Sequence, residues 1–372
     1  MNVPTLGKAV FLAAALAVAA PLTWHATQTT PAVAAAPAAV LPSFAPLVKA
    51  TRPAVVTIKT KGSSQQAQQQ IDPQMREFME RFFGRQFGQN GPRSGGTRPQ
   101  GLGSGFIIDR NGIVVTNNHV IDNSDEITVV LSDGEELSAT LIGTDPKTDL
   151  AVLRVEAGRA LPTVPWGNSD KVDIGDWAIA IGNPFGLGGT VTAGIVSARG
   201  RDINSGPYDD FLQVDTSINR GNSGGPLFDQ TGNVIGVNTA IFSPSGGNVG
   251  IGFAIPANQA REVVADLIEN GSVERGWLGV SIQPVTDEIA AAIGMDEPKG
   301  ALIANVVDGG PAEDGGLRRG DVILSFGSSP IEKVRDLTRT VADTEPGTSA
   351  KVRVLRKGSE KTLTIKTGKF PA

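Results

Sequence analysis

Short β-branched runs separated by tight-turn residues dominate residues 101–255 and limit the folds that this segment can adopt. Two clear pairs are 106–108 with 113–115, and 227–228 with 234–237, joined by turns that contain Asn111-Gly112 and Gly232-Asn233. Such turns between apolar runs are typical of β-hairpins, and their close spacing favours a barrel or a sandwich. We therefore expect this part of the chain to be all-β.

The flanking regions indicate two domains within the 372 residues. A strand is expected at 55–60, and a helix is expected to open at Pro256 and to stop at Asn270-Gly271. The expected domains are therefore 41–271 and 272–372, the second being large enough for a small fold of mixed strands and helices.

A segment rich in Gln, Gly, Pro, Arg and Ser interrupts the first domain at 61–100. Apolar residues at 75, 78, 79, 82 and 83 follow helical spacing and predict a short helix inside this inserted loop. Long loops are often functional, although the flanks fit a disordered insertion equally well.

The N-terminus has the pattern of an export signal. Lys8 precedes an apolar run at 9–20, which is shorter than the roughly 20 residues that span a bilayer. Small residues at 32–35 offer a cleavage site, so residues 1–35 are expected to be a signal peptide of an exported protein. An uncleaved membrane anchor is the alternative.

Composition excludes several kinds of site. The chain has no cysteine, which excludes disulfides and thiolate chemistry, and its net charge of −5 argues against nucleic acid as a partner. Of the two histidines, His25 would leave with the signal peptide, so no histidine-based metal site is expected. The glycines at 101–105 lack the Lys-Ser/Thr pair of a phosphate loop, and no cofactor is expected.

The segment 221–226, Gly-Asn-Ser-Gly-Gly-Pro, has the composition of a nucleophile turn. Its glycines would let the chain turn sharply and present the hydroxyl of Ser223. The N–H groups of Gly221 and Ser223 are the natural donors for an oxyanion. A plain loop between strands is the alternative.

His119 is the only candidate imidazole base after leader removal, and it follows the strand-like run 113–115. A third group would orient it, and Asp149 is the favoured candidate, with Asp145 and Asp133 as competitors. The chain order His, Asp, Ser is that of chymotrypsin-type enzymes.

These motifs resemble the HtrA (DegP/Deg) family of serine proteases from about residue 42 to the end. The matching segments are TNNHV (116–120), TDLAVL (148–153), NRGNSGGPL (219–227) and GIGFAIP (250–256). The resemblance implies a mainly β fold with a chymotrypsin-like double β-barrel protease domain, an acyl-enzyme mechanism, and a triad of His119, Asp149 and Ser223.

The same resemblance assigns further residues. Ile218, Ile241 and Phe242 match positions that line the primary specificity pocket, although ordinary barrel core explains apolar residues equally well. Arg201 matches the regulatory loop, where the alternative is a solvated surface charge.

The second domain resembles a single PDZ domain, a small α+β fold. The segment 310–324 matches the central part of PDZ domains, and the carboxylate-binding loop would consist of Trp277, Leu278, Gly279 and Val280. Such domains capture peptide C-termini by strand addition, here beside residues 280–282 and a helix near 334–341. The alternative is a PDZ fold used only for packing.

The resemblance also implies a biological setting. We expect a periplasmic stress-response endopeptidase that degrades unfolded or damaged proteins, assembled as a homotrimer through segments near Phe44 or as a larger trimer-based assembly. Two alternatives remain open: a regulatory protease that makes one specific cut, and a protein that acts mainly as a chaperone.

Overall fold

The structure is a computed structural model that describes residues 43–62, 100–183, 189–219, 221–243 and 248–371. The expected signal peptide, nearly all of the inserted loop and its helix at 75–83 lie outside these residues. In the described part of the chain, no helix is long and apolar enough to cross a membrane.

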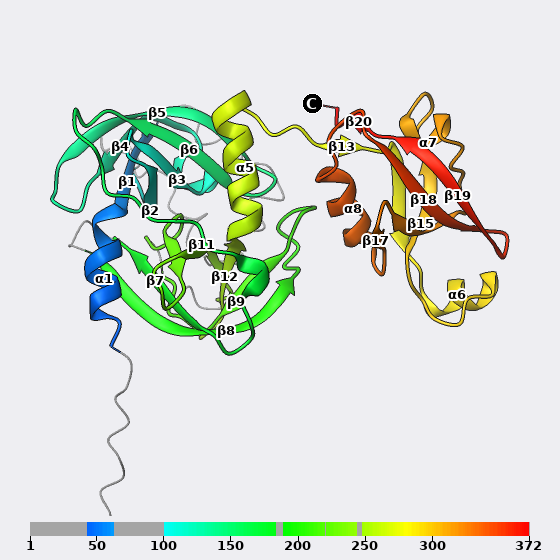
Figure 1. Ribbon diagram of the computed structural model, residues 1–372, viewed down its shortest axis with the longest axis horizontal. Helices are drawn as coiled ribbons and strands as arrows, with labels where there is room; N and C mark the ends of the chain where they lie inside the picture. Colours follow the sequence, from blue (N-terminus) through cyan, green and yellow to red (C-terminus); the bar gives the residue numbers. More distant parts are fainter. Residues whose placement is uncertain (1–42, 63–99, 184–188, 220, 244–247, 372) are drawn as a thin grey trace, which may run out of the picture. The chain divides into compact units, whose positions relative to one another are not determined.

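Six of the described strands close into a first barrel, in the order β1-β2-β3-β6-β5-β4 (Figure 1). They are β1 (Val55–Gly62), β2 (Gln100–Asp109), β3 (Ile113–Thr116), β4 (Ser124–Val130), β5 (Glu136–Asp145) and β6 (Leu150–Val155). Asp109 closes the β2–β3 turn by accepting the N–H of Asn111 on its side chain and that of Gly112 on its carbonyl. The expected hairpin therefore forms where the turn residues predicted it.

Six more strands close into a second barrel, in the order β10-β11-β12-β9-β8-β7. They are β7 (Trp177–Gly182), β8 (Thr190–Arg201), β9 (Phe211–Val214), β10 (Pro226–Phe228), β11 (Val234–Ile241) and β12 (Gly252–Pro256). The two barrels confirm the predicted mainly β, double-barrel architecture.

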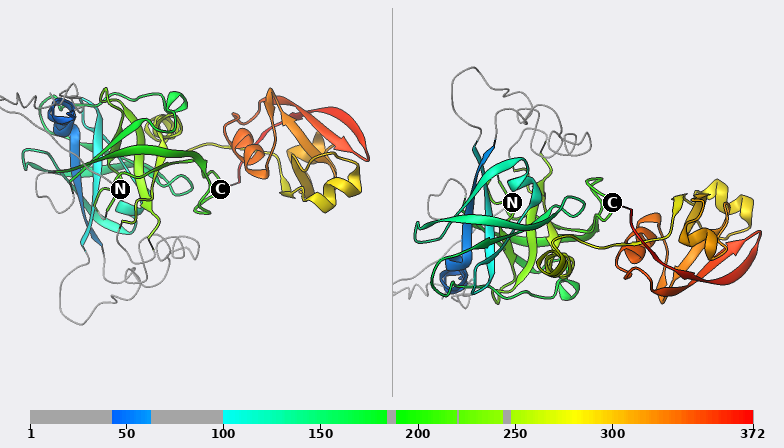
Figure 2. Two further views of the ribbon diagram at one scale, coloured as in Figure 1. Left: turned by 90° about the horizontal axis from the view of Figure 1, so that it is seen from below. Right: turned by 90° about the horizontal axis from the view of Figure 1, so that it is seen from above.

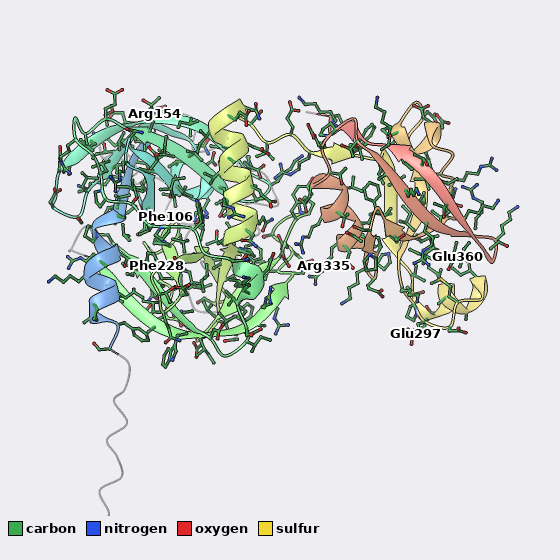
Figure 3. The ribbon with its side chains drawn as sticks, in the orientation of Figure 1. Phe106, Arg154, Phe228, Glu297, Arg335 and Glu360 are labelled. Carbon is green, nitrogen blue, oxygen red and sulfur yellow. The ribbon has the colours of Figure 1, made fainter. Side chains whose placement is uncertain are left out.

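One hydrophobic cluster extends through both barrels. It contains Phe106 of β2 and Phe228 of β10, both without exposed surface, and Figure 3 labels them in neighbouring parts of the domain. Helix α5 (Ala257–Asn270) adds Val264 and Leu267 to this cluster. It begins one residue later than expected because Pro256 completes β12, and it ends at Gly271, whose φ of 71° permits the left-handed cap.

Four short elements complete this part of the chain. Helix α1 (Ala45–Thr51) and a 3₁₀ turn (Arg52–Ala54) precede β1, and helix α4 (Asn118–Ile121) follows β3. A second 3₁₀ turn (Ser169–Lys171) leads towards β7. The histidine expected at a strand end thus lies on a one-turn helix.

The C-terminal part has its own sheet and core. Strands β14 (Val280–Pro284), β15 (Ala301–Val306), β16 (Val322–Phe326), β18 (Ser349–Arg356) and β19 (Ser359–Lys366) form the sheet, with β17 (Ser329–Pro330) beside β16. Strands β13 (Gly276–Trp277) and β20 (Gly368–Lys369) pair separately. The helices are α6 (Asp287–Ile293), α7 (Pro311–Asp314) and α8 (Val334–Ala342), as Figure 2 shows from two sides.

Candidate active site

His119 and Asp149 form a hydrogen-bonded pair between α4 and the start of β6. His119 Nδ1 lies 2.7 Å from Asp149 Oδ2, and the His119 backbone N–H donates to Oδ1 at 2.9 Å. A carboxylate oxygen accepts this hydrogen bond from Nδ1–H, which selects the tautomer of the neutral imidazole whose lone pair is on Nε2. The pair is therefore set up for His119 to accept a proton at Nε2.

The backbone at Asp149 is held in an uncommon conformation. Its φ is 57°, in the left-handed region that few non-glycine residues occupy. The Asp149 carbonyl accepts the side-chain amide of Asn117 at 2.8 Å and the N–H of Asn118 at 3.1 Å. These bonds stabilise the turn that aims the carboxylate at the histidine.

The two competing aspartates point elsewhere. Asp145 is buried and binds both terminal nitrogens of Arg275, at 3.0 Å and 2.5 Å. Asp133 is exposed and pairs with Arg159 at 3.1 Å. Of the three candidates, the described contacts bring only Asp149 to His119.

Ser223 lies on a tight turn that precedes β10. Gly221 and Gly224 have φ values of 98° and 81°, which side-chain-bearing residues rarely adopt. A Cβ on Gly224 would lie 2.3 Å from both Ser104 O and Thr116 Oγ1. The turn therefore needs glycine for its conformation and for its approach to the end of β3, three residues before His119.

Strand β11 links the nucleophile turn to the carboxylate. The carbonyl of Asn238 accepts the Gly224 N–H at 2.8 Å, and the next residue, Thr239, donates its hydroxyl to Asp149 Oδ2 at 2.9 Å. Thr239 was not predicted as a site residue. It lies in a fully buried strand, and no local sequence pattern relates it to Asp149.

The three residues assigned to the specificity pocket divide into two kinds. Ile218 and Ile241 are nearly completely buried and belong to a hydrophobic cluster of the second barrel, whereas Phe242 is 40% exposed. A Cβ on Gly252 would lie 2.8 Å from Ile218 Cδ1, so the Ile218 side chain occupies the space that a side chain at 252 would need. Ile218 therefore belongs to the core and packs closely against Gly252.

Arg201 ends β8, and its Nε donates to Gln213 Oε1 on β9 at 2.8 Å. The following loop is closed by Asp209, whose Oδ2 accepts the N–H groups of Ile203 at 3.1 Å and Ser205 at 2.8 Å. Burial raises the pKa of Asp209, and the hydrogen bonds from Ser205 and Ile203 oppose that rise. The described contacts do not join Arg201 to the triad residues.

The segment 277–280 connects β13 to β14 by a tight turn. Gly279 has a φ of 75°, and the Trp277 ring packs against it, 3.1 Å from where a Cβ would lie. The carbonyls of Leu278 and Gly279 accept the N–H groups of Ala312 and Val307, both at 2.8 Å. The side chain of Leu278 is buried in the C-terminal core. This anchoring fixes a backbone loop at the start of a sheet strand.

Within the described ranges, no cluster of three or more His, Cys, Asp or Glu side chains is arranged to hold a metal ion.

A double barrel with a His–Asp pair beside a glycine-framed serine is the architecture of trypsin-like serine peptidases. Family models agree: a trypsin-like peptidase domain matches residues 103–237, and a PDZ domain matches 276–367. The C-terminal sheet and helices are thus a PDZ domain, as predicted.

Curated relatives and solved structures define the family. A "Probable periplasmic serine endoprotease DegP-like" of Rhizobium meliloti is 46% identical over 356 residues, covering 89% of this chain and 71% of the relative. A protein of the same description in Brucella suis is 56% identical over 283 residues, covering 76% of this chain and 55% of its own length. The chain thus spans about half the length of several curated relatives that it matches.

Among solved structures, "HtrA-type protease AlgW with tripeptide" aligns with a TM-score of 0.74 at 42% identity, covering 89% of this chain and 98% of that one. The "serine endoprotease from Yersinia pestis" aligns with a TM-score of 0.63 at 34% identity, covering 89% of this chain and all of that one. The chain belongs to the HtrA (DegP-like) family of serine proteases, in a form with one PDZ domain in the sequence given.

Proposed function

We propose that this protein is a serine endopeptidase of the cell envelope that degrades unfolded or damaged proteins. The observation that carries the proposal is the Nδ1–Oδ2 hydrogen bond between His119 and Asp149, next to the glycine-framed turn of Ser223. Family membership and the relatives' names as periplasmic endoproteases support both the activity and a periplasmic location.

In this mechanism His119 Nε2 takes the proton of Ser223 as Oγ attacks the scissile carbonyl carbon. The N–H groups of Gly221 and Ser223 stabilise the oxyanion of the tetrahedral intermediate. His119 then protonates the leaving amine, which leaves an acyl-enzyme on Ser223. Water, deprotonated by His119, attacks the ester carbon, and His119 returns the proton to Ser223 Oγ as the bond to the second product breaks. Asp149 keeps the imidazole oriented and stabilises its charged form.

The substrate pocket is proposed to accept small aliphatic side chains. Its candidates Ile218, Ile241 and Phe242 are apolar and offer no partner to a charge, and burying an unpaired charge is costly. The bulk of Ile218 beside Gly252 supports a shallow pocket.

The PDZ domain is proposed to bind peptide C-termini at Trp277, Leu278, Gly279 and Val280. The fixed backbone turn at Gly279 and the adjoining strand β14 support capture by strand addition. The names of two similar structures, at 42% and 43% identity, mention a tripeptide and a decapeptide, which supports peptide binding by this protein. Arg201, ahead of the loop that Asp209 closes, is proposed to take part in regulation.

A homotrimer or a larger trimer-based assembly is proposed through the N-terminal helix. Phe44, just before α1, packs edge-on against Trp177 with 5.3 Å between ring centroids. Trp177 remains 38% exposed, so the two rings leave apolar surface that a second copy could cover.

The test is cleavage of an unfolded casein-like substrate by the purified protein and by Ser223→Ala, with products identified by mass spectrometry. The proposal expects many cuts by the wild type and a loss on the order of 10⁴–10⁶ in the variant. A single cut confined to one native protein would favour the regulatory alternative. Undiminished cleavage by Ser223→Ala would remove Ser223 from the mechanism, and substrate holding without any cutting would favour a chaperone.

A further inference from the structure

Ser104 belongs to β2 of the first barrel, yet its hydroxyl and its backbone N–H both bind residues of the candidate active site. It has no exposed surface, and the mechanism above does not use it. We infer that Ser104 is a positioning residue that holds the oxyanion-binding turn in place from the opposite barrel. The inference rests on the proposed function and adds a residue to its machinery.

Two hydrogen bonds join Ser104 to the nucleophile turn. Its hydroxyl donates to the carbonyl oxygen of Gly221 at 2.5 Å, and its backbone N–H donates to the carbonyl oxygen of Ser223 at 2.9 Å. Gly221 and Ser223 are the two residues whose N–H groups are proposed to bind the oxyanion. Ser104 therefore holds the carbonyl side of the same two residues.

A third bond fixes the orientation of the hydroxyl. The backbone N–H of Asn183, just after β7, donates to Ser104 Oγ at 2.9 Å. Ser104 Oγ uses one lone pair to accept this N–H, so its own hydrogen is free to point at the carbonyl oxygen of Gly221. The Ser104 hydroxyl thus connects Asn183 to the nucleophile turn. Asn183 in turn accepts the Gly189 N–H on Oδ1 at 2.8 Å.

The carbonyl of Ser104 extends the connection to the histidine segment. It accepts the hydroxyl of Thr116 at 2.7 Å, and Thr116 is the last residue of β3, three residues before His119. One buried residue thus joins the nucleophile turn to the strand that leads to the proposed base.

These bonds restrict the peptide plane that follows Gly221. Its carbonyl is held by Ser104, and its N–H, which belongs to Asn222, donates to Asn219 at 3.0 Å. With that plane fixed, the N–H of Gly221 can change direction only by rotation about the φ and ψ of Gly221 itself. Without the Ser104 hydroxyl, the plane would lose one of its two anchors and the oxyanion donor would be less well aimed.

Misplacing an oxyanion donor weakens binding of the transition state more than binding of the substrate. Removing such a donor outright typically lowers kcat by about 10²–10³. Since Ser104→Ala leaves the donor present but less constrained, we expect a smaller loss in kcat, about 10- to 100-fold, with KM changed by less than about threefold.

Thr57→Val is the matched control. Thr57 is also fully buried, and its hydroxyl donates to the carbonyl of Asn183 at 3.2 Å, so both variants remove a buried hydroxyl bound to the same residue. Only Ser104 binds Gly221. The experiment measures kcat and KM on a short peptide substrate, affinity for a peptidyl boronate that forms a tetrahedral adduct, and thermal unfolding of the full chain.

The expected result is a fall in kcat and boronate affinity for Ser104→Ala, with Thr57→Val close to wild type although both lose thermal stability. Ser104→Cys, whose thiol donates weakly, should fall between wild type and Ser104→Ala. Equal kcat values for Ser104→Ala and Thr57→Val would overturn the inference, as would wild-type kcat in a folded Ser104→Cys. A wild-type protein without Ser223-dependent cleavage would instead contradict the proposed function itself.

Discussion

The hydroxyl of Thr239 and Nδ1 of His119 meet at one atom, Oδ2 of Asp149, at 2.9 Å and 2.7 Å. Thr239 thereby prevents the carboxylate from turning away from the imidazole. Thr239→Val keeps the shape of the side chain and removes the donor, so we expect kcat to fall by about 10-fold, the equivalent of one hydrogen bond to a charged group. Thr239→Ser keeps the donor and serves as control. Matching kcat values for the two variants would show that the hydroxyl has no such role.

Cleavage is expected mainly after Val, Ala or Ile. The candidate pocket residues Ile218, Ile241 and Phe242 are apolar, and an unpaired Lys or Arg buried against them would be costly. Sequencing of the product termini from an unfolded substrate checks this directly. A majority of cuts after Lys or Arg would refute the assignment of these three residues.

Asp209 and Asp229 should contribute to the pH dependence of stability with opposite signs. Burial raises the pKa of Asp209 despite its hydrogen bonds. At Asp229 burial also acts to raise the pKa, but hydrogen bonds from Asn233 and Thr231 outweigh it and leave the pKa lowered. A raised pKa gives stability that is present at acid pH and lost as pH rises through the folded-state value, and a lowered pKa gives stability that is lost as pH falls.

The quantity compared is the unfolding free energy at about pH 7 minus that at about pH 4. This difference should be larger than in the wild type for Asp209→Asn and smaller for Asp229→Asn. Denaturant unfolding at the two pH values measures both variants. The same direction of change in both would contradict the opposite pKa shifts.

Peptides with apolar C-termini are expected to raise cleavage of a separate small reporter substrate. Such control requires that the peptide bind the active state more tightly than the resting state, and a tenfold difference corresponds to about 1.4 kcal/mol. Amidation of the peptide terminus should weaken the effect, because the N–H donors around Gly279 lose their anionic partner.

The alternative to this coupling is tethering, in which the PDZ domain only raises the local concentration of a bound substrate. Tethering would accelerate cleavage of long substrates that carry the recognised tail, but not of a detached reporter. Measurable peptide binding with unchanged reporter turnover would therefore support tethering and reject activation.

The sequence patterns predicted the parts of the fold that depend on neighbouring residues in the chain, such as turns and helix ends. Asn111-Gly112 and Gly232-Asn233 marked hairpins, and Asn270-Gly271 marked the end of α5. The barrel order could not be predicted from spacing, because β6 pairs with β3, and β1 pairs with β4, through contacts that no local turn specifies.

The candidate active site likewise contains residues that local sequence patterns identify and residues that they do not. His119 and Ser223 stood out because a lone imidazole and a glycine-framed serine are rare combinations. Thr239 and Ser104 did not, since each lies in a buried strand and matters only through hydrogen bonds to residues far away in the chain. His119 was expected directly after a strand but lies on α4, because Asn118 and His119 bind Asp149 through their backbone N–H groups.

The central claim is that Ser223 is the nucleophile activated by His119. A fluorophosphonate reacts covalently with an activated serine, and the site of the adduct can be located by mass spectrometry of proteolytic fragments. The account predicts one phosphonyl group per chain on Ser223 in the wild type, with little or none in folded His119→Ala under the same conditions, since the base is needed for activation. An adduct on another serine, or equally fast labelling of Ser223 without His119, would contradict it.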